Sequence, residues 1–497
     1  LTEVSIPDTV TSIGDNAFEG ATSLTEVDIP DTVTSIEYYA FANTALTELI
    51  LPKNLTTIGA RILQGNTGVT EIIIPKSVTE MGNVVAGYKG PFDESYVQKA
   101  VFEDGITRIP SYAFQGATSL TEVSIPDTVT SIGDNAFAGA ISLAEMDIPD
   151  TVTSIEYYAF ADTALTKLEL PENLTTIGAR ILQGNKGVSK VIIPKGVTEM
   201  YYNVAGNTGS FDGSQVQKAE FEKGITRIPS YAFQGATNLA EVLIPDTVTS
   251  IGNYAFAGTA LAELELPENL TTIGARILQG NTSVSEVIIP KSVTEMHYNV
   301  AGNTGSFDGS QVQEAEFEEG MKNIPAYAFQ GATNLKKVSV PDTVTSIESY
   351  AFQSTGLAIF QLKDNITNLG EYVFANCGNL EEVNWNNTLS EIPKSTFSEC
   401  ISLKKFNMTD VVKAIGENAF QGCESLENFD CTKNITTIKA GAFSNCSALK
   451  TVDIGDSVTS IGQSAFSECR ILNEIIIGKS VTVINDNAFK NCDALKE

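Results

Sequence analysis

Apolar residues recur along the whole chain in a unit of mostly 23, sometimes 22, residues, of which residues 24–41 are typical. The first part of this unit, Leu24-Thr25-Glu26-Val27-Asp28-Ile29, alternates apolar and polar side chains and predicts a half-buried strand. Pro30 ends that strand because it lacks a backbone donor, and a Val-Thr-x-Ile stretch then predicts a second short extended segment. The unit closes on an Ala-Phe pair, where we expect a single helical or 3-10 turn.

The phenylalanine near the end of the unit marks each row of the repeat. Fifteen rows carry it: Phe18, Phe41, Phe114, Phe137, Phe160, Phe233, Phe256, Phe329, Phe352, Phe374, Phe397, Phe420, Phe443, Phe466 and Phe489. Six further rows carry leucine or valine in its place: Leu63, Leu182, Leu278, Val85, Val204 and Val300. The pattern therefore predicts 21 rows with none missing.

No single row can bury its own leucine, valine, isoleucine and phenylalanine, but stacked rows share one continuous core. We therefore predict one continuous solenoid over residues 1–497, a long curved rod. Residues 1–351 are duplicated blocks with three insertions, near residues 86–96, 205–215 and 301–311, and residues 352–497 are regular rows that bear cysteine. The sequence opens inside the repeat pattern, so we expect a fragment without terminal caps.

Charge and composition exclude several classes of function. The formal net charge is −30, and a phosphate backbone needs clustered cations, so nucleic acid and anionic membranes are poor partners. No segment approaches the ~20 apolar residues of a membrane span. His297 is the only histidine, which excludes His-rich zinc sites and leaves one imidazole for nucleophilic catalysis. Because no phosphate-binding, Gly-x-Ser-x-Gly or His-Glu-x-x-His sequence occurs, we expect no enzyme, no cofactor and no metal site.

Six of the seven cysteines follow one another at intervals of 23 residues. They are Cys377, Cys400, Cys423, Cys446, Cys469 and Cys492. Earlier rows hold alanine or threonine in the same slot, as at Ala21 and Thr44, so the slot favours a small, buried side chain. We predict free structural thiols, with a stack of disulfides or a string of metal sites as the alternative.

Tyrosine or arginine recurs two residues before the marker phenylalanine. Around Arg180 and Arg276 successive rows run Tyr-Arg-Tyr, an order in which a guanidinium can stack between two rings. We interpret these residues as a cover over the core, with an aromatic ligand-binding strip as the alternative.

The first strand of each row has two outward positions, those of Glu26 and Asp28 in the second row. At the first of these positions Lys167, Lys190 and Lys218 form a run of like charge, which we expect to cost stability. Two other runs are candidate binding residues, because solenoids commonly bind ligands on a concave strand face. One run is apolar, Ile50, Ile73 and Val101, and the other is acidic, Glu263, Glu265, Glu286, Glu314 and Glu316. The alternative is a duplicated surface without a partner.

Each insertion places a Phe-Asp pair among glycines and polar residues. The three phenylalanines, Phe92, Phe211 and Phe307, are candidate binding residues because insertions in repeat arrays form loops on one side of the stack. The alternative is that each ring folds back and plugs a row that carries valine in place of phenylalanine.

The repeat resembles the BspA-like leucine-rich repeat. The resemblance rests on the sequence Ile-Pro-Asp-Thr-Val-Thr-Ser-Ile-Gly-Asp-Asn-Ala-Phe-x-Gly, at residues 6–20 and 125–139, and on the cysteine-bearing rows, and it covers essentially the whole chain. It implies a leucine-rich-repeat right-handed superhelix with a parallel β-sheet on the concave face. Short strands, turns and 3-10 or helical turns would form the convex face.

Proteins of this family are typically surface or secreted proteins of host-associated bacteria, and several are implicated in adhesion. The resemblance therefore implies a non-catalytic, adhesin-like module, extracellular or at the cell surface, that recognises a host or neighbouring-cell protein or glycan. A passive stalk that presents another domain is the alternative. We expect a monomer, with end-to-end contacts at uncapped termini as the alternative, and the family offers no catalytic residues to transfer.

Overall fold

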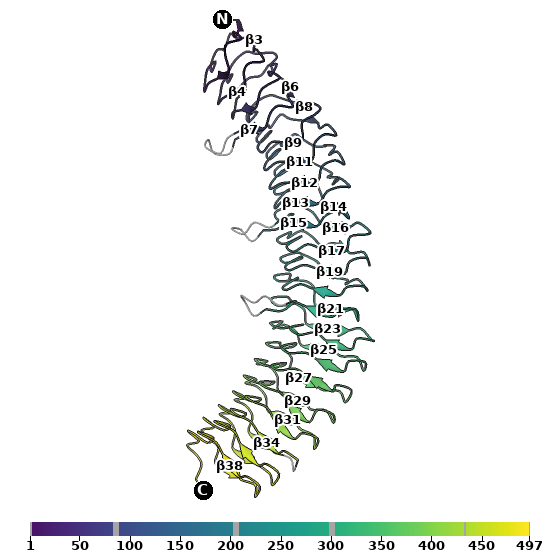
Figure 1. Ribbon diagram of the computed structural model, residues 1–497, viewed down its shortest axis with the longest axis vertical. Helices are drawn as coiled ribbons and strands as arrows, with labels where there is room; N and C mark the ends of the chain where they lie inside the picture. Colours follow the sequence, from purple (N-terminus) through teal and green to yellow (C-terminus); the bar gives the residue numbers. More distant parts are fainter. Residues whose placement is uncertain (1, 83–88, 202–207, 298–303, 432–433, 497) are drawn as a thin grey trace. The chain divides into compact units, whose positions relative to one another are not determined.

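The computed structural model describes residues 2–82, 89–201, 208–297, 304–431 and 434–496 (Figure 1). Within these ranges it contains strands and turns and no helix. The rows group into two compact units: the first comprises Leu1–Val248 and Ala255–Ala262, and the second Thr249–Tyr254 and Glu263–Glu497. Each unit is a stack of rows whose strands pair in parallel. The parallel solenoid that the repeat predicts is confirmed.

The first strand of a row forms at the alternating Leu-x-x-Val-x-Ile segment. In the first unit these strands are β1 (Glu3–Ser5), β3 (Glu26–Asp28), β6 (Glu71–Ile74), β8 (Lys99–Phe102), β10 (Glu122–Ser124), β14 (Lys190–Ile193), β16 (Lys218–Phe221) and β18 (Glu241–Leu243). In the second unit they are β21 (Glu286–Ile289), β23 (Glu314–Phe317), β25 (Lys337–Ser339), β27 (Ile359–Gln361), β29 (Glu382–Asn384), β31 (Lys405–Asn407), β33 (Asn428–Asp430), β35 (Thr451–Asp453) and β37 (Glu474–Ile476).

The second strand of a row forms where valine-threonine precedes isoleucine or a similar residue. In the first unit these strands are β2 (Ser12–Ile13), β4 (Ser35–Ile36), β5 (Thr57–Ile58), β7 (Glu80–Met81), β9 (Arg108–Ile109), β11 (Ser131–Ile132), β12 (Ser154–Ile155), β13 (Thr176–Ile177), β15 (Glu199–Met200) and β17 (Arg227–Ile228). In the second unit they are β19 (Ser250–Ile251), β20 (Thr272–Ile273), β22 (Glu295–Met296), β24 (Asn323–Ile324), β26 (Ser346–Ile347), β28 (Asn368–Leu369), β30 (Glu391–Ile392), β32 (Ala414–Ile415), β34 (Thr437–Ile438), β36 (Ser460–Ile461) and β38 (Val483–Ile484).

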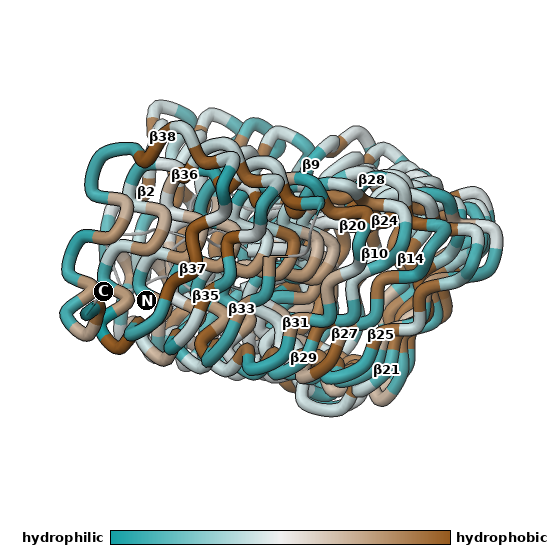
Figure 2. Tube along the Cα trace, turned by 90° about the horizontal axis from the view of Figure 1, so that it is seen from below, coloured by the Kyte–Doolittle hydropathy of each residue, from teal (hydrophilic) through white to brown (hydrophobic). Residues whose placement is uncertain are grey.

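First and second strands lie on different sides of a row and form separate sheets. In the second unit β33, β35 and β37 follow one another along one side, and β36 and β38 lie along another (Figure 2). Alternate side chains of each first strand point inward, as in β6, where Ile72 and Ile74 are buried and Glu71 and Ile73 are exposed. The alternation therefore fixes which residues of a row reach solvent.

The marker phenylalanines form a ladder of stacked rings inside each unit. In the first unit the Phe137 ring lies 6.0 Å from the rings of both Phe114 and Phe160, at interplanar angles of 4° and 9°. In the second unit the rings of Phe374 and Phe397 stack at 5.6 Å. These rings are fully buried, so each row supplies half of the environment that buries its neighbour's ring.

The Ala-Phe segment forms successive turns, not the helical or 3-10 turn that its sequence predicts. Amides alternate between two kinds of acceptor: Glu19 N–H donates within its own row to Asn16 O, whereas Phe18 N–H donates to Ala40 O in the next row. Asn16 and Gly20 adopt left-handed backbone angles (φ of 57° and 72°), which turns every second amide out of the row. Hydrogen bonding to the neighbouring row therefore replaces the continuous i→i+4 pattern of a helix.

The insertions precede the marker position of their rows instead of following it. Val85, Val204 and Val300, which the spacing predicts as markers, lie outside the described residues. The phenylalanines of the Phe-Asp pairs take the ladder position: Phe92 stacks on Phe114 at 5.0 Å, and the corresponding rings in the other two blocks stack at 5.1 and 4.9 Å. The number of rows is unchanged, but the extra residues lie before the ring.

All seven cysteines are free thiols, and six of them are buried. Each cysteine of the 23-residue ladder donates its Sγ–H to the carbonyl of a marker phenylalanine, as Cys400 does to Phe374 O at 3.1 Å. Burial raises the pKa of the Cys377 thiol to about 11 and that of Cys431 to about 12. The small-residue interpretation of the slot therefore agrees with the structure.

These thiols should be inert in the folded protein because a buried thiol with a raised pKa supplies almost no thiolate, the reactive form. We expect a thiol-specific reagent at pH 8 to modify no more than one or two groups before denaturation, with partly exposed Cys492 reacting first. In denaturant all seven should react. Fast modification of Cys400 or Cys423 in the native protein would contradict their burial.

Candidate functional site

The candidate site is the outward face of the first strands, which we call the first-strand face. Its two outward positions per row form a first column, containing Glu71 and Lys99, and a second column, containing Ile73 and Val101. The residues between them, Ile72 and Ala100, are buried and hold the strands in register. Side chains on this face are therefore fixed in spacing by the parallel ladder.

The apolar run lies at the N-terminal part of the first unit. Ile50 is 69% exposed and Ile73 is 56% exposed, which is high for large aliphatic side chains. Both line a groove of about 630 Å³ between residues 47–51 and 70–75. Val101 is the ladder partner of Ile73 and is half-buried, and it does not line the groove. The structure thus brings all three residues together and places two of them in one depression.

The groove exists because the ladder is interrupted there. Residues 48–51 form no strand, and no backbone hydrogen bond joins them to Glu71–Ile74, all of which the structure describes. Instead, the buried side chain of Asn66 spans the two rows, donating to Thr44 O and Leu46 O at 3.1 Å each. This opening leaves Ile50 and Ile73 exposed on the sides that face each other.

The lysine run is neutralised by glutamates of its own face, which the repeat alone does not predict. Lys190 pairs with Glu220 at 2.8 Å, and Lys218 pairs with Glu241 at 2.6 Å. Lys167 makes an ion pair with Glu169. The hydrogen bond to Glu241 raises the pKa of Lys218. Repulsion among the three lysines therefore costs less stability than the run of like charges predicts, because each lysine is paired with a carboxylate.

The acidic run in the second unit is compensated by an ion pair at one residue only. Glu286 and Glu314 are direct ladder partners, and of the two only Glu314 makes an ion pair, with Lys337 at 2.8 Å. The other carboxylates of the run make no ion pair with any residue that the structure describes: Glu263, Glu265, Glu286 and Glu316. All five members of the run are exposed.

An exposed isoleucine lies inside the acidic run. Ile288 is 55% exposed and is the ladder partner of Glu316, two residues beyond Glu286 on the same strand. Sequence reasoning missed it, although the alternation of β21 places it on the outward side. An apolar side chain ringed by carboxylates is a surface that a partner with basic and apolar groups can cover.

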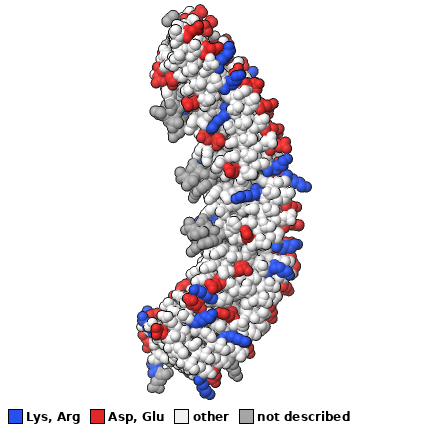
Figure 3. Space-filling model, viewed as in Figure 1, with Lys and Arg blue, Asp and Glu red and all other residues white. Residues whose placement is uncertain are grey.

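Figure 3 shows basic and acidic side chains along one edge of the molecule, with neutral surface between the groups. On the first-strand face several of these charges form ion pairs, such as Lys99 with Glu71 and Lys190 with Glu220. Glu286 and Glu316, which make no ion pair with a described residue, are therefore a local feature of this face.

The phenylalanines of the insertions are not at the surface. Phe92, Phe211 and Phe307 are fully buried in the ring ladder, so their rings cannot contact a ligand. The aspartate that follows each of them instead receives a hydrogen bond from an arginine, as Arg61 Nε donates to Asp93 at 2.6 Å. Their burial agrees with the alternative in which each ring folds back and fills the core of its own row.

The arginines of the tyrosine register fasten the inserted rows. Arg61, Arg180 and Arg276 each bind one insertion aspartate, at 2.6–2.7 Å, and one tyrosine hydroxyl, at 3.2–3.3 Å. Burial alone would lower the pKa of Arg61, but the hydrogen bonds with Tyr39 and Asp93 raise it above its usual value. One cation–π contact is present, with the guanidinium carbon of Arg180 6.0 Å from the Tyr158 ring. Tyr202 and Tyr298, the expected second rings, lie outside the described residues.

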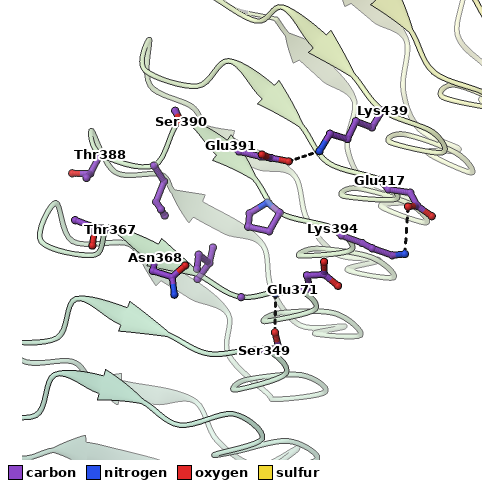
Figure 4. A pocket seen from close by; sticks show the side chains of 14 residues that line it. Ser349, Thr367, Asn368, Glu371, Thr388, Ser390, Glu391, Lys394, Glu417 and Lys439 are labelled. Atoms are coloured by element: carbon purple, nitrogen blue, oxygen red, sulfur yellow. Dashed lines mark hydrogen bonds and ion pairs between the residues drawn. The ribbon is translucent and has the colours of Figure 1, made fainter.

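A second depression, of about 690 Å³, lies on the second-strand side of the second unit (Figure 4). Lys394 pairs with Glu417 at 3.3 Å, and Lys439 pairs with Glu391 at 2.6 Å. Threonine, serine and asparagine side chains form much of the remaining wall. Two of its three carboxylates are paired with the two lysines, and Glu371 makes no ion pair with any residue that the structure describes, so this polar depression offers few unpaired charges to a ligand.

Nowhere in the described ranges do three or more His, Cys, Asp or Glu side chains come together as metal ligands would. The same ranges contain no helix with the length and apolarity needed to cross a bilayer.

The family model described as BspA type Leucine rich repeat region (6 copies) matches residues 1–87, 88–208, 205–306, 303–425 and 367–496. The chain belongs to the BspA-type leucine-rich repeat family. Among solved structures it is similar to a leucine-rich repeat protein from Bacteroides ovatus, with 22% identity, coverage of 79% of this chain and 81% of that chain, and a TM-score of 0.35. A leucine rich cell surface protein from Faecalibacterium prausnitzii has 22% identity, coverage of 86% and 88%, and a TM-score of 0.27.

The pneumococcal vaccine antigen PcpA is a further similar structure, with 15% identity, coverage of 87% of this chain and 91% of that chain, and a TM-score of 0.34. No curated protein matches the chain. In this BspA-type solenoid the residues that define the repeat, such as Val27, Ile36 and Phe41, are buried. Residues that distinguish one row from another lie mostly at outward positions, which is where a binding surface would be encoded.

Proposed function

We propose that the chain is a non-catalytic, adhesin-like binding module, secreted or held at the cell surface, that recognises a host or neighbouring-cell protein or glycan through its first-strand face. The observation that carries the proposal is the acidic run around exposed Ile288, in which only Glu314 makes an ion pair. Glu286 and Glu314 are stacked in a parallel ladder and repel each other, and a scaffold that holds so many carboxylates with one paired cation is suited to a basic partner.

Two parts of the face would contribute in different ways. Ile50 and Ile73 are exposed apolar side chains in a groove of mixed lining that a partner's side chain can enter. The carboxylates from Glu263 to Glu316 favour basic patches and make association sensitive to salt. The buried Phe92, Phe211 and Phe307 are not part of the proposed surface.

Binding should be lost on reversal of charge or polarity at this face and retained after reversal elsewhere. We would measure binding of the purified chain to immobilised matrix proteins and a glycan array, comparing wild type with Ile73→Lys and with the pair Glu265→Lys and Glu316→Lys. We expect at least one of these variants to lose about tenfold or more in affinity, since both change exposed residues of the face.

The matched control reverses two exposed charges on the second strands, Glu80→Lys with Glu199→Lys, and should bind as wild type does. Binding that persists unchanged in both face variants would exclude the first-strand face. A chain that binds nothing on either panel and does not bind itself would support the passive stalk instead.

A further inference from the structure

Two duplicated blocks carry charges of opposite sign at several outward positions. Residues 167–246 in the first unit and 263–342 in the second align without gaps at an offset of 96 and differ at 16 positions. Five of the 16 differences exchange a cation for a carboxylate or the reverse, and four of these five take the first outward position of their rows; three of the four pairs lie on first strands, and residues 167 and 263 lie outside the strands. The four pairs are Lys167 and Glu263, Lys190 and Glu286, Lys218 and Glu314, and Glu241 and Lys337.

The inverted charges occupy the same backbone positions in both units. In the first unit Lys190 is the ladder partner of Lys218, and Glu286 is the partner of Glu314 in the second. The residue beneath each ladder is also the same, with Val191 and Val287 both buried. The first-column charges therefore run plus, plus, plus, minus from residue 167 to residue 241. They run minus, minus, minus, plus from residue 263 to residue 337, with the same spacing along the sequence.

Exposed apolar side chains accompany the columns on both blocks. Ile192 is 50% exposed and Leu243 is 45% exposed in the first unit, and Ile288 is 55% exposed in the second. Protein interfaces combine a central apolar area with a polar rim. When two first-strand faces meet, these residues supply the apolar contact and the columns supply the charged one.

We propose that the first-strand face of residues 167–243 in one molecule binds the first-strand face of residues 263–339 in a second copy of the chain. This inference rests on the proposed surface-binding function and names one partner for it, the same protein presented by a neighbouring cell. It replaces the monomer that the sequence alone leads us to expect.

The ion pairs within one molecule permit this exchange. The pairs of Lys190 with Glu220 and of Lys218 with Glu241 lie at the surface and each join an exposed group to a half-buried one, and surface pairs contribute little to stability. The lysines can therefore turn to the partner's carboxylates at small cost. At physiological ionic strength charges more than about 8 Å apart are largely screened, so the net charge of −30 acts on the contact mainly through the groups nearest to it.

The test is a pair of charge-reversed variants that cannot bind themselves but can bind each other. Lys190→Glu with Lys218→Glu makes the first column predominantly acidic in both blocks. Glu286→Lys with Glu314→Lys makes the first column predominantly basic in both blocks. Sedimentation velocity over a concentration series should show self-association of wild type that weakens between 50 and 500 mM salt. Each variant alone should dissociate at a concentration about tenfold higher or more, and an equimolar mixture of the two should associate again.

Unchanged far-UV circular dichroism of both variants establishes that they fold. A wild-type chain that stays monomeric at all concentrations overturns the inference, as do variants that associate like wild type or a mixture that stays dissociated. The failure is separable from that of the proposed function: a monomeric chain that still binds the matrix or glycan panel loses only the homotypic partner.

Discussion

Replacing Phe137 with alanine should cost about 3–5 kcal/mol of unfolding free energy, because a fully buried ring is lost and a cavity remains. The ring stacks on Phe114 and Phe160, each at 6.0 Å, so its removal leaves both neighbours with one open side. Coupling in a solenoid is strongest between adjacent rows, and we expect the loss to be greatest nearby. Urea denaturation gives its size, and hydrogen exchange of amides in residues 112–162 gives its location.

The matched control is Ile141→Ala, four residues along the chain, where the side chain is 59% exposed. It should change stability by less than about 0.5 kcal/mol. A loss of less than about 1 kcal/mol for Phe137→Ala would contradict the phenylalanine ladder as the core of the repeat.

Replacing Asn185 with alanine should destabilise the first unit by on the order of 3 kcal/mol, since buried backbone groups would lose their partners. Its Nδ2 donates to Thr163 O and Leu165 O at 3.0 Å each. Its Oδ1 accepts from the amides of Gly187 and Val188 at 3.1 and 2.9 Å. Alanine fits the slot in other rows, but only where the chain satisfies these groups in another way.

Asn173→Ala is the control, because its Nδ2 also donates to a backbone carbonyl, Asp150 O at 2.9 Å, but at an exposed position. Water can replace that bond, so we expect a loss of less than about 1 kcal/mol. Equal losses for Asn173→Ala and Asn185→Ala in thermal or urea unfolding would contradict the role of Asn185 as a bridge between rows.

The strands and the buried ladder could be predicted because they depend on local alternation. Val27 and Ile29 alternate with Glu26 and Asp28. This period of two buries Val27 and Ile29 regardless of the sequence of the neighbouring row. The same alternation could have found Ile288, which occupies an outward position of β21. Stacking of equal rows then fixed the rest of the architecture.

Features that depend on contacts with the neighbouring row were less predictable from the sequence than these local ones. Spacing alone allows either Val85 or Phe92 to continue the ladder, and the choice is made by ring stacking on Phe114. The Ala-Phe segment forms turns because Phe18 N–H reaches Ala40 O in the next row, an acceptor that local sequence does not reveal. A polar residue such as Asn185 in a small, buried slot is likewise explained only by the carbonyls that it bridges.

On the candidate site, the sequence identified the charges but not their pairing. The first column alone predicts repulsion among the lysines, whereas Glu220 of the second column pairs with Lys190 across the ladder. The sequences of both columns together distinguish the paired lysines from the mostly unpaired carboxylates. The acidic run in the second unit is distinctive because cations are missing from both of its columns until Lys337.

Carboxylate footprinting tests the central claim, that the first-strand face is the binding surface, most directly. Exposed glutamates are labelled with a carbodiimide and an amine in the free chain and in the chain bound to a panel ligand or to itself, and the labelled peptides are quantified by mass spectrometry. We expect binding to protect Glu263, Glu265, Glu286, Glu314 and Glu316 from labelling, and to leave the labelling of Glu80 and Glu199 on the second strands unchanged. Protection confined to the second strands or the turns, with the acidic run still fully labelled, would contradict the first-strand face as the binding surface.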